Sequence, residues 1–329
     1  MTLVDPPRTQ AERQALLDAA YRHCAAINAE HGKSYHLATR LLTPDRRPAI
    51  HALYAAARTA DDLVDHPGAD PSGDLADWSR ALLAELEAGW SDDPVRLATV
   101  HTYRRYAIPV EHLVDFLAAM TSDLTVTGYA DMDALDRYMW GSASVIGLQV
   151  LPVLGTAPGV AREEAAPHAI ALGEAFQLTN FLRDVAEDVD RGRVYLPADL
   201  MAAHGVTREQ LAEKRYDGNF RELMREMVAI VRRRYDDAAP GTPLLAPESR
   251  DCVRAATALY GGILTEIERA DFQVLDRRVR VSKPRRLAVF ARRLTAAQLA
   301  RVRVTMAKPK SRSSTGAYAT RGPRITSGS

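Results

Sequence analysis

The chain has 329 residues, of which 47% are hydrophobic and 26% are charged. This composition is typical of a globular protein and excludes both a disordered chain and a collagen-like repeat. Two cysteines, Cys24 and Cys252, are too few for a zinc framework and do not indicate a disulfide scaffold. No apolar run approaches the roughly 18 residues that a membrane-spanning helix needs. The polar start MTLVDPPRTQAERQ shows no secretory signal, so we expect a cytoplasmic protein.

The net charge of +1 hides a strong asymmetry along the chain. Residues 277–329 hold fifteen Lys or Arg and no Asp or Glu, so they carry +15 and residues 1–276 carry −14. A basic segment of this kind can bind nucleic acid or an anionic membrane surface, or it can be a solvated tail. Because residues 307–329 have few apolar groups to bury, we expect them to form a disordered tail. No RNA- or DNA-binding module accompanies them, so nucleic acid is not an expected partner.

Apolar residues recur at helical spacing along nearly the whole chain, and the alternation typical of strands is almost absent. The spacing predicts helices over residues 9–29, 46–65, 74–88, 95–106, 109–124, 132–150, 163–190, 207–213, 218–238, 249–274 and 284–305. Turn-forming residues separate these segments, and no long linker or internal repeat divides them. The sequence therefore predicts a single all-α domain over residues 1–306.

Two of the predicted helices carry carboxylates four residues apart: Asp61 and Asp65 in one, Asp184 and Asp188 in the other. Such residues share a helix face about 6 Å apart along the axis, and their like charges destabilise an isolated helix by a few tenths of a kcal/mol. The same spacing recurs in the loop HPGADPSGD, where it has no geometric meaning. An acidic, solvated helix face would explain either pair alone.

Polar residues one or two turns upstream extend each pair into a stripe. At 100° per residue the stripes cover arcs of about 60° and 80°. Their members are Tyr54, Arg58, Asp61 and Asp65 in one helix and Gln177, Asn180, Asp184 and Asp188 in the other. Four carboxylates facing one another across a cavity would repel unless cations lay between them. Mg²⁺ or Mn²⁺, shared with a substrate phosphate, suits such a site, and two unrelated acidic surfaces are the alternative.

Longer strings around these stripes point to a family. NFLRDVAEDVDRGRVYLP (180–197) resembles the second Asp-rich motif of the squalene/phytoene synthase family, and ALYAAARTADDLVD (52–65) resembles the first. HGKSYHLATRLLTPDRRPAIHALY (31–54) resembles the N-terminal active-site segment of the family. LYGGILTEIERADFQVLDRRVRV (259–281) is similar to the C-terminal segment of bacterial, actinobacterial-type phytoene synthases. The resemblance covers about residues 16–305 and implies an all-α isoprenoid synthase fold, a helical bundle around a central cavity.

The resemblance also implies a reaction. Two geranylgeranyl diphosphates would condense head to head, through prephytoene diphosphate, to 15-cis-phytoene and two pyrophosphates, the first committed step of carotenoid synthesis. Mg²⁺ is the expected cofactor, with Mn²⁺ as a substitute, and no nicotinamide is expected. The alternative is squalene, hydroxysqualene or dehydrosqualene synthesis from farnesyl diphosphate. Because substrate and product are hydrophobic, we also expect peripheral association of the protein with the inner face of the cell membrane. The downstream carotenoid enzymes are not readable from the sequence.

Site residues follow from the resemblance position by position. The four aspartates named above would be catalytic and, together with Asn180, would hold the metal ions. Substrate-contacting positions of the family are matched by His31, Lys33, Ser34, Tyr54, Arg58, Tyr138, Gln177, Arg183 and Tyr260. Arginine can bond phosphate oxygens bidentately, and an aromatic face can stabilise a carbocation.

Simpler roles stay open for several of these residues. Arg183 could form a helix salt bridge with Glu187, and the tyrosines could be core fillers. The small residues of GSASVIG (141–147) could line a channel or allow close helix packing. Gly261-Gly262 departs from the larger or charged residues of several family members, which leaves a C-terminal substrate contact open.

Overall fold

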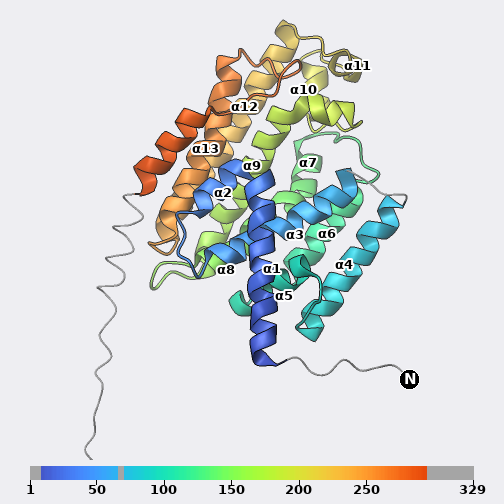
Figure 1. Ribbon diagram of the computed structural model, residues 1–329. Helices are drawn as coiled ribbons and strands as arrows, with labels where there is room; N and C mark the ends of the chain where they lie inside the picture. The colour runs from blue at the N-terminus through green and yellow to red at the C-terminus, as the bar shows by residue number, and fades with distance from the viewer. Residues whose placement is uncertain (1–8, 66–69, 295–329) are drawn as a thin grey trace, which may run out of the picture.

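The computed structural model describes residues 9–65 and 70–294, shown as coloured ribbons in Figure 1. Within these ranges the regular structure is helical, and β pairing is confined to two isolated bridges, Gly128–Val194 and Thr156–Leu245. The predicted all-α class is therefore confirmed. The predicted tail, residues 307–329, lies outside the described residues.

The first half of the chain supplies six α-helices: α1 (Gln10–His31), α2 (Lys33–Thr39), α3 (Arg47–Asp65), α4 (Pro71–Ala88), α5 (Pro94–Tyr106) and α6 (Glu111–Ser122). Side-chain caps explain several of the starts. Thr9 and Glu12 form a capping box at α1, and Asp70 and Asp93 cap α4 and α5, each followed by proline in the first turn. Helix α2 was not predicted, because its seven residues follow Gly32 directly and are too few to show a helical period.

The second half contains α7 (Met132–Met139), η1 (Trp140–Ser144), α8 (Val145–Leu154), α9 (Arg162–Asp190), α10 (Ala198–Ala203), α11 (Arg208–Ala212), α12 (Gly218–Ala238), η2 (Ala239–Leu244) and α13 (Arg250–Arg269). The prediction of one helix over 132–150 was wrong, since η1 is a π-helical turn between two α-helices. Helix α10 was missed because it has only six residues.

The chain after α13 also differs from the prediction of a helix over 249–274. The helix ends at Arg269, and Asp271 and Phe272 follow with φ of 51° and 63°, values that a right-handed helix cannot contain. Residues 283–294 are helical again, within the predicted 284–305, whose remainder lies outside the described residues.

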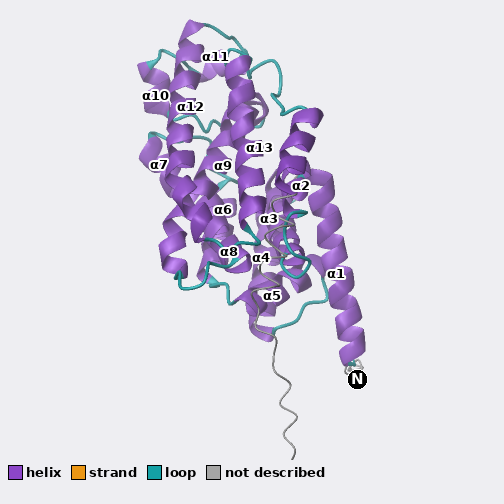
Figure 2. Ribbon diagram, turned by 90° about the vertical axis from the view of Figure 1, so that its left-hand side faces the viewer, coloured by secondary structure: helices purple, strands orange, loops and turns teal. Residues whose placement is uncertain are grey.

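Helix α9 is the axis of the bundle. It packs against α8, η1, α12 and α13, while α3 packs against α1, α5 and α6 on the other side of the interior. Figure 1 shows α12 and α13 along one side of α9, and in Figure 2 α1 lies at the edge of the bundle opposite α10 and α12. One large core holds most of the buried apolar side chains, and a smaller cluster around Cys24 joins α1, α3 and α5. No helix of the described residues is both long enough and apolar enough to span a bilayer.

Glycines bring α8 and η1 against α9 backbone to backbone. A Cβ added to Gly147 would lie 2.2 Å from the Ala169 carbonyl oxygen, and one added to Gly173 would lie 2.4 Å from that of Ala143. Residues 142, 143, 146 and 147 also line the central cavity. The segment 141–147 therefore fulfils both expectations at once: its small side chains allow the close packing and form part of the cavity wall.

This close contact predicts that replacing glycine by alanine in the helix, which ordinarily stabilises a protein, lowers its stability at position 147. Gly147→Ala should lower the free energy of unfolding by about 1–3 kcal/mol, because the backbone of α9 cannot yield to the added methyl group. Gly261→Ala is the matched control within a helix: its nearest neighbour would be Tyr235 at 4.0 Å. There the gain in helix propensity should raise the stability by roughly 0.5–1 kcal/mol. Denaturant unfolding of both variants measures the difference, and equal effects would contradict this account of the packing.

Candidate functional site

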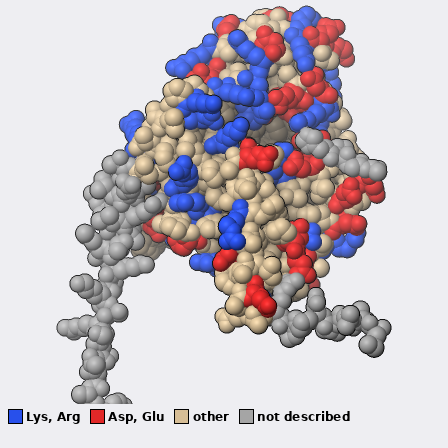
Figure 3. Space-filling model, viewed as in Figure 1, with Lys and Arg blue, Asp and Glu red and all other residues tan. Residues whose placement is uncertain are grey.

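A cavity of about 1070 Å³ lies between α3 and α9. Its walls also include residues of α2, α6, α8, α12 and α13. Charged side chains line the end at the C-terminal turns of α3 and α9, whereas most of the other lining side chains are aliphatic or aromatic, with Arg254 and Arg293 among the exceptions. The cavity therefore combines a polar mouth with an apolar interior. In Figure 3 the charged side chains of both signs gather over the upper part of the face in view.

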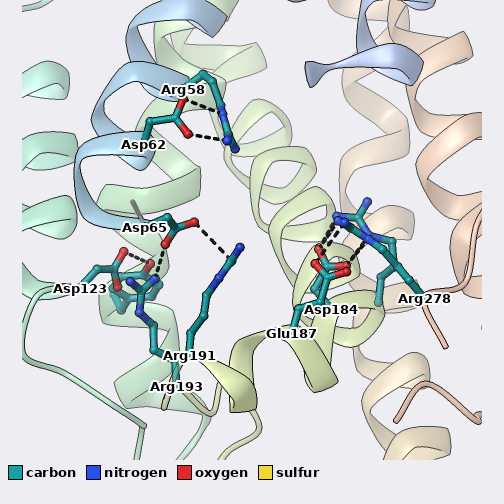
Figure 4. A network of polar contacts seen from close by, with 11 residues as sticks. Arg58, Asp62, Asp65, Asp123, Asp184, Glu187, Arg191, Arg193 and Arg278 are labelled. Carbon is teal, nitrogen blue, oxygen red and sulfur yellow. Dashed lines mark hydrogen bonds and ion pairs between the residues drawn. The ribbon is translucent and has the colours of Figure 1, made fainter. Parts of the chain in front are cut away.

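The α3 wall carries all four members of the first predicted stripe: Tyr54, Arg58, Asp61 and Asp65. Arg58 is held by its neighbour one turn on, because its Nε donates to Asp62 Oδ2 over 3.1 Å. Asp62 thus orients Arg58 from outside the stripe (Figure 4). Helix α3 brings the four side chains together because its apolar residues point to the core on its other sides.

The α9 wall carries the second stripe: Gln177, Asn180, Asp184 and Asp188. Arg183 also lines the cavity, and its Nε donates to Asp184 Oδ1 over 2.8 Å. The alternative of a salt bridge between Arg183 and Glu187 is not what the structure has, since Glu187 pairs with Arg278 at 3.1 Å. The two predicted stripes thus face one cavity, and two unrelated acidic surfaces are excluded.

Three arginines at the mouth were not singled out from the sequence. Arg278, from the segment after α13, contacts Asp184 with its Nε 2.9 Å from Oδ1. Arg193 and Arg191, just beyond α9, reach across to Asp65 at 3.0 and 3.3 Å (Figure 4). All three lie inside the family strings, but each stands beside other arginines. Which one faces the cavity depends on the turn after the helix, and no periodicity reveals that.

Two aspartates of the stripes have strongly raised pKa values. Burial, followed by the nearby Asp65 charge, raises the pKa of Asp61 to about 7. Burial and the Asp184 charge raise the pKa of Asp188 to about 8. Among the described residues, neither carboxylate takes part in a hydrogen bond or an ion pair.

These carboxylates suit a divalent metal ion. Oxygen donors whose negative charge is uncompensated are the ligands that Mg²⁺ and Mn²⁺ prefer. No three His, Cys, Asp or Glu of the described chain lie close enough to enclose an ion alone. That arrangement fits a metal held by one or two carboxylates and completed by a phosphate ligand.

Tyr138 belongs to an aromatic cluster beside the first stripe. Its hydroxyl donates to Asp123 Oδ2 over 2.8 Å, and its ring lies 5.1 Å from Tyr129 and 5.9 Å from Tyr195. Phe181 stacks on Tyr195 at 3.9 Å. Burial raises the pKa of Asp123 to about 6. Asp123 and Tyr195 line the cavity but were missed, because no helical stripe connects them to the aspartate pairs.

The remaining predicted residues divide into two groups. His31 lies at the mouth, and Tyr260 stacks on Phe176 at 4.5 Å within the cavity wall. Lys33 and Ser34, at the start of α2, do not line the cavity, and Lys33 is exposed. Their contact with substrate stays a prediction.

Gly261 and Gly262 point away from the cavity. A Cβ on Gly262 would meet Val281 at 3.4 Å, and one on Gly261 would approach Tyr235 at 4.0 Å. The pair leaves room for the segment that follows α13.

Comparison with known proteins agrees with this geometry. A family model described as squalene/phytoene synthase matches residues 28–285. Phytoene synthase 2, chloroplastic, of Solanum lycopersicum is 37% identical over 286 residues, which are 86% of this chain and 92% of the relative. The chain belongs to the squalene/phytoene synthase family. Phytoene synthase, chloroplastic, of Narcissus pseudonarcissus is also 37% identical, over 84% of this chain and 66% of the relative.

Solved structures of relatives share the fold. A dehydrosqualene synthase in complex with ligand superposes with a TM-score of 0.79 at 25% identity, over 87% of this chain and 99% of that one. A squalene synthase of Alicyclobacillus acidocaldarius gives a TM-score of 0.70 at 22% identity, over 78% and 96%. The predicted isoprenoid synthase fold is therefore confirmed. The family consists of prenyltransferases that use divalent metal ions and act on prenyl diphosphates, so the chain is an enzyme of this class.

The raised pKa values predict how stability depends on pH in the absence of divalent ions. Asp61 and Asp188 titrate near 7 and 8 in the folded chain, against about 3.9 for an unfolded Asp. Their stabilising contribution is therefore complete below about pH 4 and is lost as the pH rises through 7 and 8. Thermal unfolding in EDTA should show falling stability from pH 5 to 8.5.

Substitution separates these two groups from the rest of the chain. Asp61→Asn with Asp188→Asn should flatten the decline, whereas Asp236→Asn, at an exposed position of α12, should not. An unchanged slope in the double variant would show that the two carboxylates are not buried as described.

Proposed function

We propose that the chain is a phytoene synthase, which condenses two geranylgeranyl diphosphates to 15-cis-phytoene and two pyrophosphates. The observation that carries the proposal is the identity of 37% with a phytoene synthase over 92% of that relative's length. The cavity supports it, because a diphosphate needs a cationic, metal-binding end and a long prenyl chain needs an apolar interior. The two phytoene synthases named above are plant proteins, so the kinship with actinobacterial-type enzymes stays a prediction.

At the mouth, both walls would take part in binding the metal ions. We infer that Asp61 and Asp65 hold metal on the α3 side, and Asn180, Asp184 and Asp188 hold it on the α9 side. Bound Mg²⁺, or Mn²⁺ in its place, would neutralise the charge that develops on the departing diphosphate.

Arginines of the mouth would bind the phosphate oxygens. Arg58 and Arg183 line the cavity, and Arg278 enters from the C-terminal segment. Each guanidinium can donate two parallel hydrogen bonds to a phosphate. Each contacts an aspartate in the structure, so diphosphate and metal would exchange one set of charge partners for another. The arginines thus keep the acidic mouth compensated before substrate arrives.

The interior would protect the cationic intermediates. Carbocations react with water, so the reaction needs a cavity from which water is excluded. Apolar side chains such as Phe116, Ile146 and Leu172 line the interior and bind no water. The faces of Tyr138, Phe181 and Tyr195 lie next to the polar end, where the positive charge would arise, and can stabilise it by cation–π attraction.

Dehydrosqualene or squalene synthesis from farnesyl diphosphate is the second candidate. It is favoured by one observation, the TM-score of 0.79 with a dehydrosqualene synthase. The two functions differ in substrate length, C20 against C15, and one assay separates them.

The purified protein should convert geranylgeranyl diphosphate, with Mg²⁺ and without a nicotinamide, into a C40 hydrocarbon. Parallel reactions with farnesyl diphosphate, analysed by mass spectrometry, complete the test. A C30 product from farnesyl diphosphate alone would replace the proposal by the second candidate, and NADPH would then distinguish squalene from its dehydro or hydroxy relatives.

Variants of the mouth belong to the same assay. Asp61→Ala or Asp184→Ala should reduce the rate well below a tenth of the native value, a loss greater than ~1.4 kcal/mol in barrier terms. Asp236→Ala is the matched control on the surface. A variant that keeps more than a tenth of the rate would contradict the metal assignment, provided that its circular dichroism is native.

We further propose that the protein is cytoplasmic and binds peripherally to the inner face of the cell membrane. Lys283 and Arg292 are exposed on the helical segment 283–294, and Leu287 between them is 61% exposed. Each well-placed basic side chain adds roughly 1 kcal/mol of attraction to an anionic surface.

Co-sedimentation with vesicles tests this proposal. Binding should require anionic lipid and should weaken when Lys283 and Arg292 are both changed to Glu. Equal binding to neutral and anionic vesicles would refute it. A double Glu variant at Arg22 and Arg80, which are exposed on α1 and α4, changes the net charge by the same amount and controls for a general charge effect.

A further inference from the structure

The first turns of α9 meet η2 at the end of the cavity that lies away from the charged mouth. Ala165 and His168 of α9 and Gly241 of η2 all line the cavity there. A Cβ added to Gly241 would lie 2.3 Å from His168 Cβ, so the two elements are already in contact. The His168 Nδ1 donates to the carbonyl oxygen of Asp237 over 2.6 Å, which fixes the ring. Ala165 and Gly241 are buried. We call these three residues the floor.

The depth of the floor below the mouth can be estimated along helix α9, because this helix runs from the polar mouth to the apolar end. Gln177 stands one turn before Asn180, the first metal-binding candidate on this helix. From Gln177 to Ala165 the helix descends twelve residues, or about 18 Å at 1.5 Å per residue. Side chains of a helix lean toward its N-terminus, so the ring of His168 reaches toward the level of Ala165.

Prenyl chains of different length reach this depth differently. An extended carbon chain advances about 3.5 Å for every three bonds. A C20 prenyl chain has fifteen bonds along its main chain and spans about 18 Å, whereas a C15 chain has eleven and spans about 13 Å. A C20 chain that begins beside Gln177 therefore ends at the floor. A C15 chain ends about one isoprene unit above it.

We propose that Ala165, His168 and Gly241 bind the terminal isoprene unit of the substrate chain that lies along α9 and set the preference for C20 over C15. The cavity is deep at this end because Ala165 carries only a methyl group and Gly241 has no side chain. The imidazole of His168 sets the limit of that depth. The inference rests on the proposed function, because it names the feature that selects the substrate of that reaction. A shorter chain would leave the floor without contacts, and the packing lost there lowers its reactivity.

Two variants should shift the length preference in opposite directions. Ala165→Leu raises the floor, so the ratio of kcat/KM for geranylgeranyl over farnesyl diphosphate should fall at least about tenfold. His168→Ala lowers it, so a C25 prenyl diphosphate should gain at least about tenfold relative to the C20 substrate. Ala161→Leu adds the same atoms four residues away, at an exposed position that does not line the cavity, and should keep the native ratios.

The ratios are measured on variants whose thermal unfolding is compared with the native chain. If Ala165→Leu does not fold, His168→Ala alone tests the proposal. This variant removes atoms and creates no steric clash. Unchanged length ratios in a folded His168→Ala variant would overturn the floor. The native chain in the same assay tests the function separately: if it gives no C40 hydrocarbon, the proposed function fails, whereas native C40 synthesis with unshifted variants refutes only the floor.

Discussion

Repulsion between carboxylates in a buried place is the constraint on which the rest of the site depends. Two helices bring their acidic stripes to one cavity mouth, where burial, together with the charges of Asp65 and Asp184, raises the pKa of Asp61 and Asp188. Arginines that pair with aspartates compensate the negative charge of the mouth. They come from three separate parts of the chain: α3, α9 with the turn after it, and the segment after α13. The mouth is thus assembled by electrostatics between distant segments, and metal ions with a diphosphate would complete the same balance.

The polar mouth suits a prenyl diphosphate only because the cavity behind it is apolar and deep. Helix α9 links the two, since one straight element carries aspartates at its C-terminal end and small apolar residues near its start. A change of register in α9 would displace both ends together. The position of the diphosphate and the space for the hydrocarbon are therefore coupled through the backbone of a single helix.

The sequence predicted the features that depend on local, periodic patterns within one helix, and it missed features that depend on contacts between distant segments. The stripes at 54–65 and 177–188 follow from the helical period, and the structure places both on one cavity. Arg278, Arg193 and Asp123 were not singled out, because loops and turns position them, and turns have no period to read. The helix predicted over 132–150 is interrupted by the π-turn at 140–144, which packs against α6 and α9 and which the helical period does not reveal. Lys33 and Ser34 rest on the resemblance alone, because they are not among the residues that line the cavity, and their contact with substrate stays a prediction.

The backbone contact between α8 and α9 has a consequence for redesign of the cavity. Gly147 and Gly173 hold the two main chains so close that no side chain fits between them. This wall can be neither thickened nor moved without breaking the bundle, so an engineer who wants a wider or narrower chamber must work from the other sides. The same restriction applies to natural variation: apolar lining residues of α3, α6 and α13 can change in size without separating two main chains, whereas the glycines at 147 and 173 cannot.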